Sequence, residues 1–147
     1  MIDRLRRRSQ RALLAVLAYG IALFWVNHIP KVSVPLSGAG GDKVAHFLAY
    51  ALLAFLLAWT VYPERRGRAL GYLALLLGAT AYGAIDEWLQ QYVPHRTADW
   101  RDWIADILGA GLGLSTHAVV AGPIGRLRAK LFPSDRSAAP PPPTTPP

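Results

Sequence analysis

The side chains in this sequence that could do chemistry are carboxylates, a histidine, an amide and two basic groups, placed where long apolar segments begin or end. Many of them repeat at helical spacing in three groups: Asp42, His46 and Tyr50; Glu87 and Gln90; and Asp99, Asp102 and Asp106. Residues three or four positions apart share one face of an α-helix, so each group directs its polar atoms the same way. The sequence therefore predicts three helix ends whose polar faces meet in one layer.

Carboxylates beside a histidine are suited to proton transfer, and arginine or lysine is suited to holding a phosphate group. We expect Glu87 or Asp86, beside His46, to form a general base and its orienting partner. We expect Arg96 and Lys43 to bind the phosphate. The predicted catalytic residues are His46, Glu87 and Asp86, and the predicted substrate-binding residues are Asp42, Lys43, Tyr50, Gln90, Arg96, Asp99, Asp102 and Asp106.

A divalent metal ion is a variant of the same site. His46, Glu87 and Asp106 would offer one imidazole and two carboxylates, which suit a hard or borderline ion. The sequence has no HExxH motif and no pair of histidines at metal-binding spacing, so no metal ligand is predicted and the cofactor is left open. The absence of cysteine excludes thiolate ligands, a cysteine nucleophile and a disulfide framework.

A structural role is the alternative for part of this set. Asp42 and Asp102 are placed to cap helix N-termini, where a carboxylate accepts hydrogen bonds from free backbone N–H groups. Asp86, Glu87 and Gln90 lie at the end of an apolar segment, where the helix dipole disfavours anions, so they need partners. A buried structural network stays open as an explanation, and a pocket is the preferred one.

Four apolar segments must position these residues, in a chain that is 52% hydrophobic and 17% charged. Each segment is close to the ~20 residues that a helix needs to cross a bilayer. They are apolar on all sides and rich in leucine and alanine, which favours helices that satisfy their own backbone in lipid. The sequence predicts an all-α integral membrane protein, a four-helix transmembrane bundle with spans at about 12–29, 44–62, 69–91 and 103–121.

The basic residues predict the orientation of this bundle. Of the 16 lysines and arginines, 12 lie before residue 12, within 63–68 or after residue 121. Cytoplasmic flanks accumulate such residues, so both termini and the 63–68 loop are predicted to be cytoplasmic, with the polar layer on the outer side. This topology accounts for the net charge of +7 without a nucleic-acid partner. A cleaved signal peptide is ranked below an uncleaved first span.

Three shorter features complete the organisation. The 63–68 loop predicts an antiparallel hairpin of the second and third spans, and small residues such as Gly109 and Gly113 predict close helix contact. After Gly122 and Pro123, the segment 124–132 alternates basic and apolar residues, which predicts a position along the inner membrane surface. The Pro-rich tail, residues 133–147, is predicted to be disordered.

The polar motifs together resemble the VanZ-like membrane protein family. They are Asp42-Lys43-x-x-His46-Phe47-x-x-Tyr50, Asp86-Glu87-x-x-Gln90, Pro94-x-Arg96, and Asp99-x-x-Asp102-x-x-x-Asp106-x-x-Gly109-x-x-x-Gly113. The resemblance implies a small multi-pass protein of the bacterial plasma membrane, in a family named for a member that lowers susceptibility to teicoplanin. Ala105-Asp106 departs from the two polar residues usual there, and the family supplies no defined reaction.

Two classes of function follow from these features. The first is an enzyme or binder that acts on an envelope lipid or a lipid-linked cell-wall precursor at the outer leaflet. The second is a non-catalytic accessory protein that masks an envelope component. A small transporter ranks lower, because the acids are gathered at one end rather than spread through the membrane. The expected partners are membrane lipids, and the oligomeric state is left open.

Overall fold

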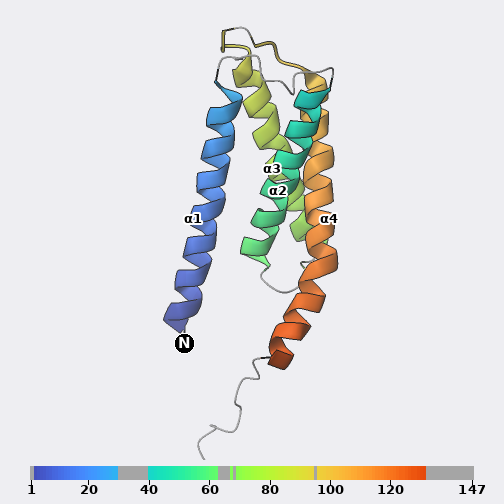
Figure 1. Cartoon of the computed structure of the whole chain (residues 1–147). Coiled ribbons are helices and arrows are strands. Elements are labelled where there is room, and N and C mark those ends of the chain that lie inside the picture. Colours follow the sequence, from blue (N-terminus) through green and yellow to red (C-terminus); the bar gives the residue numbers. More distant parts are fainter. Residues whose placement is uncertain (1, 30–39, 63–66, 68, 95, 132–147) are drawn as a thin grey trace, which may run out of the picture.

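The computed structural model describes residues 2–29, 40–62, 67, 69–94 and 96–131, and it is helical throughout its regular parts (Figure 1). Within these residues there is no strand. Each helix contains a stretch long and apolar enough to cross a membrane, which confirms the predicted all-α, four-span architecture. The helices are α1 (Ile2–Asn27), α2 (Gly41–Val61), α3 (Ala69–Gln90) and α4 (Trp100–Leu131).

The helices extend furthest beyond the predicted spans at two places. α1 begins at Ile2, so the basic residues before position 12 belong to the same helix as the first span. α4 continues through Pro123 to Leu131, where the sequence suggested a break and a separate segment. A proline removes one backbone hydrogen bond and bends a helix, and the last turns of α4 do lean away from its upper part (Figure 1). The position of 124–132 along the membrane surface remains a prediction.

The connections and the tail carry several of the predictions from sequence. The 63–66 segment with Pro63, Arg65 and Arg66, the neighbouring Arg68, and the segment 30–39 lie outside the described residues. The same holds for Phe132 and for the Pro-rich tail, residues 133–147. The hairpin of α2 and α3 is nevertheless visible, because the two helices run in opposite directions (Figure 1).

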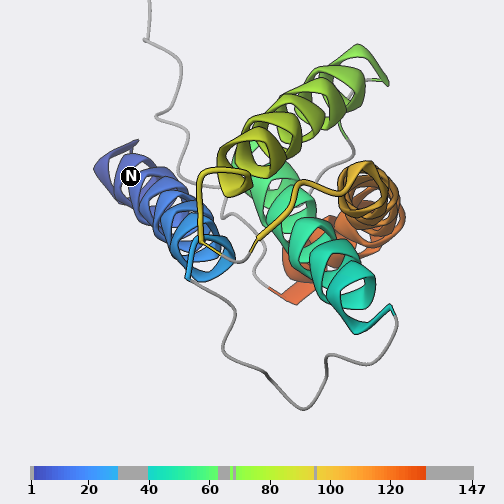
Figure 2. The same cartoon turned by 90° about the horizontal axis from the view of Figure 1, so that it is seen from above.

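α2 lies between the other three helices and packs most closely against α4 (Figure 2). Glycines make this approach possible, because a Cβ at Gly109 or at Gly113 would overlap the carbonyl oxygen of Phe47 or of Ala51 on α2. Small side chains continue the contact away from these glycines, in a core of Ala54, Ala58, Ala79, Ala110 and Leu114. The predicted role of small residues on α4 is thus seen against α2. Gly78 on α3 has no such neighbour.

The outside of the bundle is apolar and the inside holds the polar groups. Large aliphatic side chains are exposed along every helix, among them Leu14, Ile21, Leu48, Leu70, Leu108 and Val119. This distribution inverts that of a water-soluble protein and suits a hydrocarbon surrounding. The polar side chains gather where α1 and α3 end and α2 and α4 begin, the upper end in Figure 1, which we call the polar end.

Candidate functional site

All four helices contribute buried polar side chains to the polar end. The sequence predicted contributions from three of them, and the structure adds the end of α1. The buried polar residues at this end are Asn27, His46, Asp86, Glu87, Gln90, Asp102 and Asp106. Such groups are normally hydrogen-bonded when buried, so their partners indicate what each one does.

His46 and Asp106 form the deepest pair of this cluster. The Nδ1 atom of His46 lies 3.0 Å from Oδ1 of Asp106, and the carboxylate is only 1% exposed. Both residues sit between one and two turns inside their helices, below the helix ends. Space for the carboxylate comes from Gly83 on α3, because a Cβ there would lie 2.9 Å from Oδ2 of Asp106. A buried acid bonded to one ring nitrogen fixes the orientation of the histidine.

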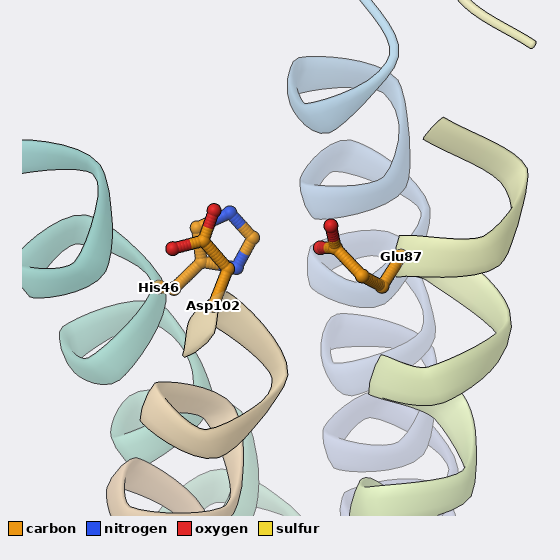
Figure 3. A group of neighbouring side chains, drawn as sticks. All are labelled: His46, Glu87 and Asp102. Carbon is orange, nitrogen blue, oxygen red and sulfur yellow. The ribbon is translucent and has the colours of Figure 1, made fainter. Parts of the chain in front are cut away.

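Glu87 approaches the same histidine from α3. Its Oε1 atom accepts a hydrogen bond from the backbone N–H of Asp99, and its Oε2 atom is buried without a partner among the described residues. One ligand atom each from His46, Glu87 and Asp102 lie within 4.8 Å of one another (Figure 3). These three residues could hold a metal ion. The sequence grouped Asp106 with His46 and Glu87, whereas the structure places Asp102 there and Asp106 on Nδ1 of His46.

Lys43 connects α2 to the segment before α4. Its ammonium group donates to Asp99 at 3.0 Å and to Asp102 at 2.9 Å, and it lies 3.6 Å from Asp42. The backbone N–H of Arg101 and the ammonium of Lys43 hold the pKa of the Asp99 carboxyl below its usual range. The charge of Lys43 is already balanced by these acids, so Lys43 is less suited to phosphate binding than the sequence suggested.

Asp86 belongs to a second group that faces α1. It accepts hydrogen bonds from Nδ2 of Asn27 at 2.6 Å and from Nε2 of Gln90 at 3.3 Å, and Nδ1 of His28 is 3.6 Å away. Gln90 in turn accepts a hydrogen bond from Arg96 at 3.2 Å. Of the two adjacent acids offered as partners of His46, Glu87 is therefore the one grouped with that ring by the structure.

Asn27 and His28 are site residues that the sequence analysis did not include. His28 also approaches the carbonyl of Phe24 at 2.8 Å and stacks on the Phe24 ring. The available signal was their position, because they end the first apolar segment and so fall in the same layer as the other helix ends. Asparagine and histidine are common at a membrane interface. These two residues are therefore recognised as part of the site by their position in the polar layer and not by their type.

Several buried polar atoms at this end have no hydrogen-bond partner among the described residues. They are the Tyr50 hydroxyl, Glu87 Oε2, Asp106 Oδ2, Asp86 Oδ1, His28 Nε2 and Arg96 Nε. An uncompensated buried polar atom is unfavourable by about 1–3 kcal/mol, so each of these atoms would gain from a further partner. The arrangement is therefore suited to binding a polar group from outside the chain, with an acid-oriented histidine beside it.

The opposite end of the bundle holds a separate polar group around His117. Its Nδ1 accepts from the Tyr72 hydroxyl at 2.9 Å, and its Nε2 donates to the Tyr62 carbonyl at 3.2 Å. The rings of Phe55 and Trp59 pack edge-on against it. A hollow of about 310 Å³ lies nearby, lined by Gly67, Ala69, Tyr72, Leu114, Ser115 and Ala118. With both ring nitrogens satisfied, His117 is a packed, hydrogen-bonded histidine.

Comparison with known proteins adds two matches. The model of the VanZ/LLP1 family matches residues 4–121, which includes every residue of the polar end described above. An uncharacterized protein of Schizosaccharomyces pombe is 33% identical over 90 residues, which cover 61% of this chain and 52% of the relative. The chain thus spans about half the length of that relative. No solved structure matches the chain.

Proposed function

Because this chain belongs to the VanZ/LLP1 family, whose model covers residues 4–121, we propose that it is a multi-pass membrane protein that binds the phosphate-bearing headgroup of an envelope lipid at its polar end. The observation that carries the proposal is a buried polar cluster at one end of a bundle with an apolar exterior. A lipid can reach such a cluster with its headgroup while its chains stay in the bilayer along the helices.

The depth of the cluster supports a headgroup as the ligand. Exposed aromatic side chains lie near the ends of α1 and α3 and at the start of α4, namely Trp25, Trp88, Tyr92 and Trp100. Tryptophan and tyrosine prefer the headgroup level of a membrane, so these positions support an interface at the polar end. His46 and Asp106 lie between one and two turns below this level and are buried inside the bundle, where a headgroup that enters the polar end could reach them.

Arg96 is the proposed phosphate-binding residue. Its guanidinium donates to Gln90 at 3.2 Å, while Nε is buried and has no partner among the described residues. A guanidinium with free donors is suited to a phosphate, which it can contact through two parallel hydrogen bonds. Lys43 is instead balanced by acids, so its proposed role is to hold the Asp99 and Asp102 side chains in place.

Hydrolysis of the headgroup phosphoester is a second candidate, and the His46–Asp106 pair favours it. A histidine oriented by a buried acid is suited to take a proton from water as the water oxygen bonds to phosphorus. The bond to the alcohol then breaks, and the protonated histidine returns the proton to the leaving oxygen. The accessory role without chemistry is the alternative, in which the same residues bind the headgroup only.

The side of the membrane and the cellular effect are part of the same proposal. The 12 basic residues that flank the opposite end support an outward-facing polar end in the plasma membrane. A cysteine replacing the exposed Thr97 should then react with an impermeant thiol reagent in intact cells, and one replacing the exposed Leu131 should not. The family's link to teicoplanin susceptibility would follow from altered envelope lipids. The relative in a yeast, an organism without a bacterial cell wall, favours a phospholipid over a cell-wall precursor.

The test is direct binding of a short-chain phospholipid to the purified full chain in detergent, measured by calorimetry. Arg96→Ala should weaken binding by more than about tenfold, because a hydrogen bond to a charged group contributes roughly 1.5–3 kcal/mol. Arg101→Ala is the matched control, since the Arg101 guanidinium lies over the exposed Trp100 ring, 5.7 Å from its centre. Equal affinity in the two variants, or no binding by the unmodified chain, would contradict the proposal.

A further inference from the structure

We propose that His46, Glu87 and Asp102 form a binding site for one divalent metal ion of the first transition row, Mn²⁺ or Zn²⁺. The site lies at the polar end, and the proposal does not rest on lipid binding. Each of α2, α3 and α4 contributes one ligand to this site. An ion there would join the three helices whose ends meet at this layer.

The spacing of the ligand atoms fits an ion. The three atoms lie within 4.8 Å of one another, and all three side chains are buried. Metal–ligand bonds of about 2.0–2.2 Å place three ligand atoms around one ion roughly 3–4 Å apart. Side-chain movements of no more than about 0.7 Å each would therefore close the group onto an ion, without a change in the helices.

The partner of His46 supplies a second observation. Nδ1 of His46 is bonded to Asp106, which leaves Nε2 as the nitrogen for an ion. Metal-binding histidines usually donate their other N–H to a carboxylate, which fixes the tautomer and raises the basicity of the ligand nitrogen. Asp106 is positioned for that role, and because it is only 1% exposed, solvent does not compete for its carboxylate.

The carboxylate of Glu87 supplies a third observation, and this one points to a ligand. It is held through Oε1 by the backbone N–H of Asp99, while Oε2 is buried without a partner among the described residues. The side chain is only 6% exposed and points from α3 toward His46 and Asp102 (Figure 3). An anionic oxygen left unpaired in a buried place is strongly unfavourable, and a cation beside it removes the penalty.

Lys43 limits but does not fill the site. Its ammonium occupies Oδ1 of Asp102, and a carboxylate has a second oxygen that can bind an ion. One imidazole with two carboxylates suits Mn²⁺ and Zn²⁺ better than Ca²⁺, which prefers oxygen ligands alone. Three protein ligands leave coordination positions open, which is the pattern of catalytic rather than structural metal sites.

The experiment measures Mn²⁺ binding to the full-length chain, purified in detergent and stripped with EDTA, by electron paramagnetic resonance. We expect one bound Mn²⁺ per chain and competition by Zn²⁺. Glu87→Gln keeps the size of the side chain and its bond from Asp99 but removes the charge, and should weaken binding by at least about 10–100-fold. His117→Asn is the control, because His117 is equally buried but lies at the opposite end of the bundle, bonded to Tyr72 and Tyr62, and this variant should bind Mn²⁺ as the unmodified chain does.

A measurement on the unmodified chain keeps the test independent of folding of the variants. Spin-echo modulation of bound Mn²⁺ should show an imidazole nitrogen, which only His46 supplies within this group. Absence of bound Mn²⁺, absence of the nitrogen signal, or equal losses of affinity in Glu87→Gln and His117→Asn would overturn the proposal. Arg96→Ala should bind the ion normally, so that failure of lipid binding and failure of metal binding give different results.

Discussion

The two ends of the bundle each bury one histidine where α2 meets α4, His46 on α2 and His117 on α4, but the partners of the two rings differ in kind. His117 is bonded through both nitrogens to neutral groups, the Tyr72 hydroxyl and the Tyr62 carbonyl, and aromatic rings enclose it. His46 is bonded to the Asp106 carboxylate, and the Glu87 carboxylate beside it has an unpartnered buried oxygen among the described residues. Both ring nitrogens of the structural histidine, His117, have hydrogen-bond partners within the chain. The cluster at His46 instead retains buried polar atoms without a hydrogen-bond partner among the described residues.

This difference gives a physical criterion for function that burial alone does not. His117 is 0% exposed and His46 is 7% exposed, so their burial is nearly the same. The two histidines differ in whether the polar atoms around them can still bind a further ligand. The comparison can be tested by making the same substitution at both positions, because asparagine can replace the Nδ1 position of a histidine but offers nothing in place of Nε2.

The largest effect is expected for His46→Asn. The asparagine amide can still donate to Asp106, so the free energy of unfolding should change little. Loss of Nε2 should lower the affinity for Mn²⁺ by more than about 100-fold, beyond the 10–100-fold that loss of an outer partner causes. The measurements are Mn²⁺ binding and the melting temperature in detergent. A stable variant with unchanged metal affinity would end the distinction between the two histidines.

A smaller effect is expected for His117→Asn, and it should fall on stability rather than on metal binding. The asparagine oxygen can still accept from Tyr72, but the Tyr62 carbonyl loses its donor inside the bundle. One unsatisfied buried group is unfavourable by about 1–3 kcal/mol, so the free energy of unfolding should fall by that amount. Metal and lipid binding at the other end should stay the same. Unfolding in increasing concentrations of a denaturing detergent measures the loss of stability. A loss of Mn²⁺ affinity in this variant would contradict the expectation that the polar end is unaffected.

Much of this architecture could be predicted from residue spacing, and the remainder depends on how each helix is turned. Apolar length fixes four spans, and helical spacing fixes that Asp102 and Asp106 share a face. Spacing does not say which neighbour that face meets. Adjacent residues point about 100° apart on a helix, so Asp86 faces α1 while Glu87 faces His46, and only the rotation of α3 in the bundle decides between them.

The division of roles between Asp102 and Asp106 has the same origin. One turn of α4 separates them, so the depth at which His46 enters decides which acid meets Nδ1 and which lies beside the Glu87 carboxylate. The close approach of α2 to α4 at Gly109 sets that depth. Small residues on α4 predict close contact, but not that α2 is the partner. The continuity of α4 through Pro123 was likewise not readable from local signals, because packing can retain a helix that a proline bends.

The smallest effect is expected from a matched pair of glycine substitutions on α3. Gly78 has nothing within 4 Å of an added Cβ, so Gly78→Ala should stabilise the helix by about 0.5–1 kcal/mol. At Gly83 the same Cβ would lie 2.9 Å from Oδ2 of Asp106 and 3.2 Å from the Tyr50 ring, so crowding should cancel that gain. The displaced carboxylate should also turn His46 and weaken Mn²⁺ binding several-fold, while Gly78→Ala leaves it unchanged. If Gly83→Ala proves as stable as Gly78→Ala and binds Mn²⁺ with unchanged affinity, the polar end tolerates movement of Asp106, and the orienting role of that acid is wrong.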